Sequence, residues 1–504
     1  MDSGQPRSKS GIISFAMPYS DLRDFIQRLE SSGELLRITE PVRAELEITA
    51  WADRTMKQPG GGKALLFENV IRMGETQPCG IPVLVNAYGS RKRMAWALGV
   101  EEIEEIPVRI RQLLKPEIPT GLIDKMKFIP QLVEFTHYPP RIVKSGPCQE
   151  VVMDPPDLTR LPVCKCWPED GGSFFTLPQI ITKGLEDGQR NVGMYRMQVY
   201  DKQTTGMHWH MHHGGCGHFG EYRKAHKRME VAVALGGDPA LGYSASAPLP
   251  DGIDEYLFAG FLRRKPVDLV QCKTVDLQTP ADAEMVLEGY VDPDETRIEG
   301  PFGDHTGFYS LQDHYPAFHV TAITHRKNPI YPHTIVGPPP MEDYYLGWAT
   351  ERIFLPLIQL VLPEIIDFAL PLEGIFHNFV FVRIRKRYPG HAFKVMNAIW
   401  GLGQLMFSKF IVVVDDSVDV QNTSEVLWVL GNHCEPERDT LISKGPRDAL
   451  DHATPLPHFG SKMGFDATEK WPEEGHNRPW PDRIAMDKDV LNRVNETWLR
   501  LKLP

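Results

Sequence analysis

Short apolar runs separated by turn residues fill the middle of this 504-residue sequence. The runs lie at residues 179–182, 192–200, 230–235, 269–271 and 285–291. Segments of this length, bounded by glycine, proline or aspartate, are typical of the strands of an antiparallel barrel or sandwich. The middle of the chain is therefore predicted to fold as a sheet-rich domain.

Both ends of the chain alternate helical and strand-like patterns instead. On the N-terminal side we expect a helix that Ser20 caps and Gly33 ends, strands at 35–38, 64–67 and 83–86, and a short helix at 107–114. On the C-terminal side we expect a strand at 379–384, a helix at 390–407, a strand at 410–414, a helix at 424–431 and a final amphipathic helix at 489–501. Strand, helix and strand in this order predict a βαβ unit with parallel strands.

The length of the chain predicts several domains, because 504 residues exceed a single ordinary core. We expect a flexible N-terminal tail at 1–17, an α/β domain at 18–140, a β-rich domain at 141–328 and an α/β domain at 329–504. The most apolar region, 353–372, is interrupted by Pro356, Pro363 and Glu364. We therefore expect a buried helix pair there rather than a membrane span.

The balance of charged side chains argues against a nucleic-acid partner. The formal net charge is −11 and the pI is about 5.9, whereas nucleic-acid binding calls for a basic face. The seven cysteines are scattered and include no Cys-x-x-Cys pair, which suits reduced thiols in a cytosol. We expect a cytoplasmic protein with a small-molecule substrate and, since no basic amphipathic helix stands out, at most peripheral membrane contact.

Two carboxylates, Glu299 and Asp304, flank a Gly-Pro-Phe-Gly turn and are candidates for proton transfer. Carboxylates brought together can have their pKa values pushed apart, which yields one acid and one base. Arg196 lies in an otherwise apolar run, and if it is buried it needs an anion that Glu299 or Asp304 could supply. The alternatives are an acidic turn that faces water and an arginine on an exposed sheet face.

Histidines cluster in one segment, where six of the 18 fall between positions 208 and 226. In an extended segment His208, His210 and His212 share one face, so they could bind a metal, line a substrate pocket or lie on a polar surface. The Gly-x-Gly-x-x-Gly match at 215–220 has no βαβ unit around it, and we expect a flexible loop there rather than a dinucleotide site. An amide oxygen and a carboxylate, from Asn191 and Glu255, would suit a hard cation such as Mg²⁺ or Mn²⁺.

Several ordered motifs together resemble one family, the UbiD decarboxylases, which use prenylated FMN to add or remove CO₂ on aromatic and unsaturated acids. The motifs lie at 21–25, 166–170, 191–196, 254–256, 286–290, 299–309 and 461–468. The resemblance runs from residue 19 to the C-terminus. It implies an N-terminal α/β domain, a central flavin-reductase-like split β-barrel that holds the cofactor, and a C-terminal α/β domain for oligomerisation.

The same resemblance implies roles for individual residues. Asn191, Glu255 and His212, or His213 in its place, would bind the Mn²⁺ that tethers the flavin phosphate, with K⁺ as a further candidate ion. The residues expected to contact prenylated FMN are Met194, Tyr195, Arg196, His208, Trp209, His210, His213 and Gly214. Arg196, Glu299 and Asp304 would form the catalytic network, with Asp304 as the proton donor, and that step needs an acid whose pKa lies near neutrality.

The motifs at 207–209, 171–175 and 349–352 resemble the branch assigned to menaquinone synthesis by the futalosine route, which decarboxylates a dihydroxynaphthoate. A hydroxybenzoate of ubiquinone synthesis is the other expected type of substrate. The implied partners are a flavin prenyltransferase and further copies of the chain, in a dimer or hexamer. The competing hypotheses are a metal enzyme built on the histidine cluster without flavin, and a non-catalytic assembly partner.

Overall fold

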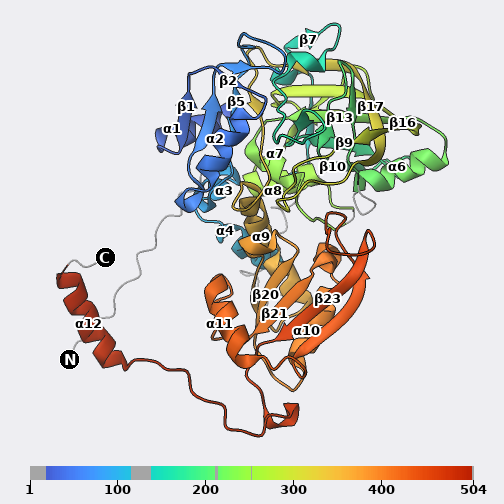
Figure 1. The fold of residues 1–504 in the computed structure, drawn as a ribbon. Coiled ribbons are helices and arrows are strands. Elements are labelled where there is room, and N and C mark those ends of the chain that lie inside the picture. Colours follow the sequence, from blue (N-terminus) through green and yellow to red (C-terminus); the bar gives the residue numbers. More distant parts are fainter. Residues whose placement is uncertain (1–18, 115–137, 210–213, 251, 502–504) are drawn as a thin grey trace, which may run out of the picture.

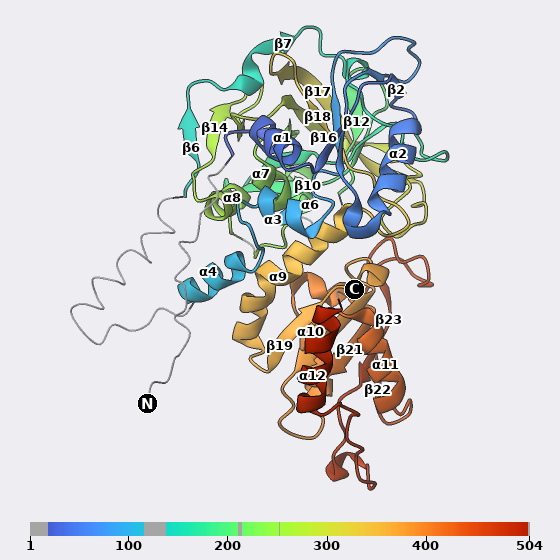
Figure 2. The ribbon, with the colours of Figure 1, turned by 90° about the vertical axis from the view of Figure 1, so that its left-hand side faces the viewer.

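The computed structural model describes residues 19–114, 138–209, 214–250 and 252–501 (Figure 1). The predicted tail at 1–17 lies outside these ranges, as do His210, His212 and His213. The N-terminal and central parts of the chain lie together in the upper half of Figure 1, and the C-terminal part forms the lower half. Helix α9 (Asp343–Val361) runs between the two halves in both views (Figure 2).

Helix α1 (Leu22–Ser31) and a four-stranded sheet build the N-terminal part. The helix begins one residue later than the sequence suggests, because Asp21 rather than Ser20 caps it by accepting hydrogen bonds from the N–H groups of the next turn. The sheet has the order β1 (Leu35–Ile38), β3 (Ala64–Phe67), β5 (Val83–Val85) and β18 (Tyr331–Pro332). Strand β18 pairs in parallel with β5, so a segment beyond the central sheet completes the N-terminal one. The other helices here are α2 (Glu47–Met56), α3 (Arg91–Ala97) and α4 (Glu105–Leu114).

A seven-stranded sheet forms the centre of the molecule. Its order is β10 (Arg190–Met194), β9 (Gln179–Lys183), β13 (Met229–Leu235), β16 (Met285–Glu299), β17 (Asp313–His325) and β12 (Thr204–Gly206), and β7 (Val151–Met153) pairs with β17. Alternate residues of β13 point to opposite faces of the sheet and enter different cores. Val231 and Val233 belong to one core, and Ala232 and Ala234 belong to the other. Helices α7 (Pro239–Ser244) and α8 (Glu255–Arg263) contribute to the second core. Both faces of the sheet are thus buried, which explains why β13 reads as a nearly continuous apolar run.

The run at 192–200 is not one strand. Strand β10 pairs with β9, whereas β11 (Met197–Gln198) pairs with β8 (Phe174–Phe175). Tyr195 and Arg196 lie at the break, where a Cβ on Gly193 would lie 2.1 Å from the Tyr195 ring. Because residue 193 is glycine, the Tyr195 side chain can lie along the strand. Arg196 takes part in neither strand pairing.

The C-terminal part is a second α/β unit with the sheet order β19 (Ile365–Ala369), β20 (Phe379–Ile384), β21 (Phe410–Val414), β23 (Phe459–Asp466) and β22 (Thr440–Pro446). Strands β20 and β21 are parallel and are joined through α10 (His391–Ile399), which confirms the predicted βαβ unit. Helix α11 (Thr423–His433) packs on the same sheet. The mixed fold class expected from the sequence is confirmed.

Two expectations for the helices are wrong. The apolar region at 353–372 is one helix, α9, followed by strand β19, because α9 continues through Pro356 and the apolar residues after Pro363 pair with β20. The glycine-rich motif at 215–220 lies within helix α6 (Gly214–Lys224) and is not a loop. No helix in the described ranges combines the length and the apolarity that crossing a bilayer requires.

The last helix, α12 (Lys488–Arg500), follows an extended segment and stands away from the rest of the molecule (Figure 1). It is amphipathic, as expected, but none of its residues is buried. Its apolar side chains Leu491, Val494 and Trp498 are each more than 40% exposed.

We expect Gly289→Ala to destabilise the central sheet. Gly289 lies at a register shift of β16 and β17, where an added Cβ would lie 1.9 Å from the carbonyl oxygen of His319. Forcing the two strands apart should cost about 1–3 kcal/mol and lower the midpoint of thermal unfolding.

The matched control is Gly431→Ala in α11, where the new methyl group would have no described atom within 4 Å apart from the adjacent backbone of its own helix and its chain neighbours. Alanine should be neutral or stabilising there because it is the better helix former. Equal melting temperatures for the two variants would contradict the packing described for Gly289.

Candidate active site

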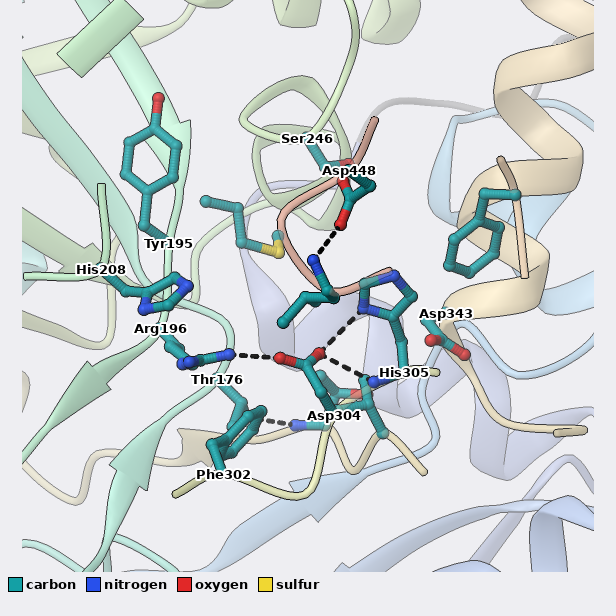
Figure 3. A pocket seen from close by; sticks show the side chains of 15 residues that line it. Thr176, Tyr195, Arg196, His208, Ser246, Phe302, Asp304, His305, Asp343 and Asp448 are labelled. Atoms are coloured by element: carbon teal, nitrogen blue, oxygen red, sulfur yellow. Dashed lines mark hydrogen bonds and ion pairs between the residues drawn. The ribbon is translucent and has the colours of Figure 1, made fainter. Parts of the chain in front are cut away.

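A cavity of about 380 Å³ lies between the central sheet and the C-terminal part (Figure 3). Five residues predicted for the site line it, namely Met194, Tyr195, Arg196, His208 and Asp304. The other lining residues, which had no predicted role, are Thr176, Ser246, Phe302, His305, Thr334, Val336, Asp343, Phe376, Asp448 and Leu450. The volume is in the range of small-molecule sites.

Arg196 connects the two predicted carboxylates. Its Nε donates to Glu299 at 3.1 Å, and its Nη1 donates to Asp304. Its remaining nitrogen, Nη2, donates to the Ser310 hydroxyl at 3.1 Å, and the guanidinium carbon lies 4.7 Å from the centre of the Phe302 ring. All three charged side chains are less than 10% exposed. The prediction that a carboxylate pairs with Arg196 is confirmed, and the acidic turn does not face water.

Asp170 holds the loop that carries Asp304. Strand β16 ends at Glu299, and the chain turns at Gly300, where φ is +95°. The Asp170 carboxylate accepts hydrogen bonds from the N–H groups of Cys166, Trp167 and Gly303. The conformation of the loop is therefore fixed by the motif at 166–170.

Gly303 allows Trp167 to lie against this loop. A Cβ on Gly303 would lie 2.2 Å from the indole ring, and the indole N–H donates to the Val336 carbonyl at 2.8 Å. The tryptophan thus packs directly on the backbone that precedes Asp304. This close approach explains why glycine is needed immediately before the acid.

The pKa of Asp304 differs from the near-neutral value expected from the sequence. Burial favours the neutral acid, but the charges of Arg196 and His305 outweigh it and hold the pKa of Asp304 below its usual range. The pKa of Glu299 is lowered in the same way, against burial, by Arg196 and His208. Both acids are therefore carboxylates at neutral pH in this arrangement.

His208 is joined to the acid network. Its Nδ1 hydrogen-bonds Glu299, and its ring packs on Tyr315 with the centroids 4.3 Å apart. Burial, followed by the charge of Arg196, lowers the pKa of His208, so the ring is neutral near pH 7. Its Nδ1 therefore carries the hydrogen that it donates to the carboxylate.

His305 is a residue that sequence reasoning left without a role. Its Nδ1 lies 2.8 Å from Asp304 Oδ1, and its side chain is 21% exposed where it lines the cavity. Although burial opposes the charged form, the hydrogen bond and charge of Asp304 raise the pKa of His305 to about 9. Its position directly after Asp304 in the sequence was the one signal that could have identified it.

The cavity wall opposite Arg196 comes from more distant parts of the chain. Asp343 begins α9, and burial raises its pKa to about 7. Phe376 precedes β20 and packs on Gly347 of α9, where an added Cβ would lie 2.3 Å from its ring. Asp448 comes from the segment between β22 and β23. Figure 3 shows Asp343 on the side of His305 that faces away from Arg196, and Asp448 above the His305 ring.

Glu255 lies against the strand that carries Asn191, and the oxygens of these two side chains are of the type that suits a hard cation. Glu255 begins α8 and accepts the N–H of Val192 at 3.0 Å, which places its carboxylate next to the residue that follows Asn191. Burial raises the pKa of Glu255 to about 7. The amide nitrogen of Asn191 is buried, and the Asn191 side chain hydrogen-bonds Tyr195. A Cβ on Gly214 would lie 2.0 Å from the Asn191 amide oxygen, so glycine leaves this oxygen accessible.

Two predicted cofactor residues are placed beside this pair rather than along the cavity. Gly214 begins α6 at Asn191, and Trp209 packs on Phe219 of the same helix with the ring centroids 5.4 Å apart. His210, His212 and His213 belong to the segment outside the described residues. Within the described ranges, no group of three or more histidine, cysteine, aspartate or glutamate residues could hold a metal ion.

Solved structures of a decarboxylase and of a UbiD-class enzyme share this fold. Vanillic acid decarboxylase of Sedimentibacter hydroxybenzoicus in its closed form is 28% identical, with a TM-score of 0.82 over 95% of this chain and 99% of that chain. Its open form gives a TM-score of 0.76 over 96% and 99% of the two chains. The UbiD-class enzyme HmfF of Pelotomaculum thermopropionicum in complex with FMN is also 28% identical, with a TM-score of 0.78 over 94% and 99% of the two chains. An evolved dimeric form of HmfF in complex with prFMN gives 0.74 over 93% and 97%.

Fold and site together define a UbiD-class enzyme. Three family models match the chain, the N-terminal, Rift-related and C-terminal domains of 3-octaprenyl-4-hydroxybenzoate carboxy-lyase, at residues 26–110, 141–339 and 344–467. An uncharacterized protein of Aquifex aeolicus is 55% identical over 96% of this chain and 99% of its own length. The chain therefore belongs to the UbiD family, which confirms the resemblance seen in the sequence.

The ion pair between Asp304 and His305 predicts a loss of stability at alkaline pH. The pKa of His305 is raised in the folded state, so the pair stabilises the fold fully below the ordinary histidine pKa of about 6.5. This stabilisation is lost as the pH rises through about 9. The difference in free energy of unfolding between the wild type and His305→Gln should shrink by about 3 kcal/mol between pH 6 and pH 10.

Urea unfolding at a series of pH values would measure this difference. A difference that stays constant over the range would contradict the raised pKa of His305.

Proposed function

We propose that the chain catalyses the reversible, non-oxidative decarboxylation of an aromatic carboxylic acid with prenylated FMN, and that Asp304 delivers the proton. The observation that carries this proposal is the Arg196 guanidinium paired with both Glu299 and Asp304 at the wall of a cavity. Membership of the UbiD family supports the carboxy-lyase activity, and the complexes of HmfF with FMN and prFMN support the flavin.

Each side chain of the network has a part in this reaction. Arg196 holds Asp304 in one orientation beside the cavity and compensates its charge. Glu299 is held on the same guanidinium and is the hydrogen-bond partner of His208. When bound, prenylated FMN supplies an electron sink for the electron pair that remains when CO₂ leaves. The protein adds an oriented substrate, a site that limits water, and one proton at the carbon that loses CO₂.

The cavity suits a planar aromatic acid. Phe302, Phe376 and Leu450 provide apolar contacts for an aromatic ring, and the polar groups of the network lie on one side of the cavity. We propose a quinone precursor of the hydroxybenzoate or dihydroxynaphthoate type as the substrate. A flavin prenyltransferase would supply the cofactor, and further copies of the chain would complete a dimer or hexamer.

We further propose that Mn²⁺ binds at Asn191 and Glu255, where it would hold the flavin phosphate. The buried carboxylate of Glu255 has no ion pair with a described lysine or arginine, since Arg190 pairs with Asp254 at 2.6 Å instead. A hard divalent cation would compensate this charge and prefers carboxylate and amide oxygens. His212 or His213 is the proposed third ligand, and K⁺ is a second ion for the same region. All seven cysteines are free, which supports a reducing compartment such as the cytosol.

Cofactor analysis tests the proposed function most directly. Protein expressed together with a flavin prenyltransferase should carry a flavin with the mass and absorption of prenylated FMN, and should release CO₂ from hydroxybenzoates or dihydroxynaphthoates. Protein expressed without the prenyltransferase should bind FMN and be inactive. Decarboxylase activity without any flavin would overturn the proposal in favour of a metal enzyme.

Asp304→Asn tests the role of Asp304 as the proton donor. The amide can still accept the hydrogen bond from Arg196, so the loop and the flavin should be retained. Turnover should fall by about 10²–10⁴-fold because the amide cannot transfer a proton. Full activity of this variant would exclude Asp304 as the donor.

The proposed cation site predicts that Glu255→Gln and Asn191→Ala lose bound manganese. Elemental analysis should show less than a stoichiometric amount of Mn²⁺ in both variants, and flavin should be lost on gel filtration. Asp254→Asn is the matched control, because Asp254 caps α8 and pairs with Arg190 but is not a proposed ligand. Retention of manganese in Glu255→Gln would contradict this site.

A further inference from the structure

The surroundings of Asp304 favour its ionised form, which lacks the proton that the proposed reaction requires. Replacing a C–C bond to CO₂ by a C–H bond consumes one proton in each turnover. The carboxylate of Asp304 is held between Arg196 and His305, two cations that both favour its ionised form. Another group must therefore hold the proton and hand it to Asp304 during the reaction.

His305 has the geometry of that group. Its Nδ1 lies 2.8 Å from Asp304 Oδ1, while the other carboxylate oxygen, Oδ2, accepts from Arg196. The two cations thus occupy different oxygens, and only His305 can give up its proton at neutral pH. The backbone N–H of His305 also donates to Asp304 Oδ1 at 2.8 Å, which fixes this oxygen toward the imidazole (Figure 3).

The exposures of the two side chains give the transfer a direction. The Asp304 side chain is 7% exposed, whereas that of His305 is 21% exposed and faces the cavity. Water in the cavity can therefore reach the imidazole more easily than the carboxylate. A proton taken up from water would reach Asp304 through His305.

The titratable groups around His305 come from four segments. Asp304 lies on its own loop, Asp343 begins α9, Asp448 lies between β22 and β23, and His377 precedes β20. The three carboxylates favour an imidazolium at His305. The ring of His377 lies 5.5 Å from that of His305, but burial lowers the pKa of His377 to about 4, so this neighbour is neutral.

We propose that His305 is the proton reservoir of this enzyme, an imidazolium that passes its Nδ1 proton to Asp304 for delivery to the substrate carbon. The inference rests on the proposed decarboxylation and deepens it. As the C–C bond breaks and CO₂ leaves, the proton on Nδ1 moves to Asp304 Oδ1 and from there to the carbon, where it forms the C–H bond with the electron pair left behind. His305 is then neutral and takes a proton from water before the next turnover. Carboxylation runs through the same steps in reverse.

Two substitutions separate this role from simple positioning. His305→Asn keeps an N–H donor near the place of Nδ1, so it can still orient Asp304, but it has no proton to transfer. A positioning role predicts near-normal activity for His305→Asn. A reservoir predicts that kcat falls about 10²-fold in both His305→Asn and His305→Gln, with KM changed little and flavin content unchanged. Added imidazole should restore part of the activity.

The pH profile of the loaded enzyme provides a second distinction. In the wild type, kcat for decarboxylation should decline as the pH rises through about 9, where the imidazolium is lost. Both His305 variants should lack this alkaline decline. His319→Gln is the matched control, because His319 also pairs with a carboxylate, Glu295 at 2.6 Å, but does not line the cavity. It should keep the activity and the pH profile of the wild type.

A titration that needs no cofactor tests the ion pair itself. In the full-length protein with ¹³C-labelled histidine, the NMR signal that disappears in His305→Gln should titrate well above the ordinary histidine range. In Asp304→Asn it should titrate at least one pH unit lower. An ordinary pKa in both proteins would overturn the proposal.

The outcomes also separate this inference from the function on which it rests. If the prenylated-FMN form of the wild type converts no aromatic acid, both the function and the reservoir fail. If the wild type is active and His305→Asn matches it, the reservoir fails and the decarboxylase remains.

Discussion

The site depends on one guanidinium that compensates two buried carboxylates. Glu299 and Asp304 come from the end of β16 and the loop that follows it, and both are almost fully excluded from water. Without Arg196 they would be two like charges in a medium that stabilises neither. The break between β10 and β11 brings the guanidinium to them. The Asp170 contacts and the close approach of Trp167 to Gly303 then hold the loop in place.

This compensation also decides where a proton can reside. A carboxylate beside an arginine holds no proton at neutral pH, and the arginine cannot release its own proton to it. An imidazole on the other oxygen changes the situation, since it is charged at neutral pH and can still lose that charge. The network thus combines a permanent cation, which fixes geometry, with an exchangeable one. Glu299 is also held at both oxygens, by the Arg196 cation on one and by the neutral His208 imidazole on the other.

The sequence was informative where a local pattern decides the structure. Short apolar runs bounded by turn residues located β9, β10, β13 and β16 of the central sheet, and the burial cost of an arginine correctly implied its carboxylate partner. It failed where tertiary contacts decide. The apolar residues after Pro363 form a strand because β20 is available to pair with them, and β16 extends to Glu299 because β17 continues alongside it.

The chemistry of the site shows the same division. Asp304 could be identified from its motif, but the direction of its pKa shift depends on which cations lie on which oxygen, and that is a property of the folded loop. Asp343, Phe376 and Asp448 are 39 to 144 residues beyond Asp304 along the sequence and carry no local signal of a shared cavity. Only the position of α9 between the two halves of the molecule brings them to it.

Residues of the central part and of the C-terminal part line the cavity together. The proton affinity of His305 therefore depends on how close the C-terminal part lies. Asp304 and His305 belong to the central part, whereas Phe376 and Asp448 belong to the C-terminal part. Moving the C-terminal part away would admit water to the imidazole and remove the negative charge of Asp448 from it. By thermodynamic linkage, protonation of His305 and the nearness of Asp448 favour each other, so the charge state of one loop and the packing of another are energetically coupled.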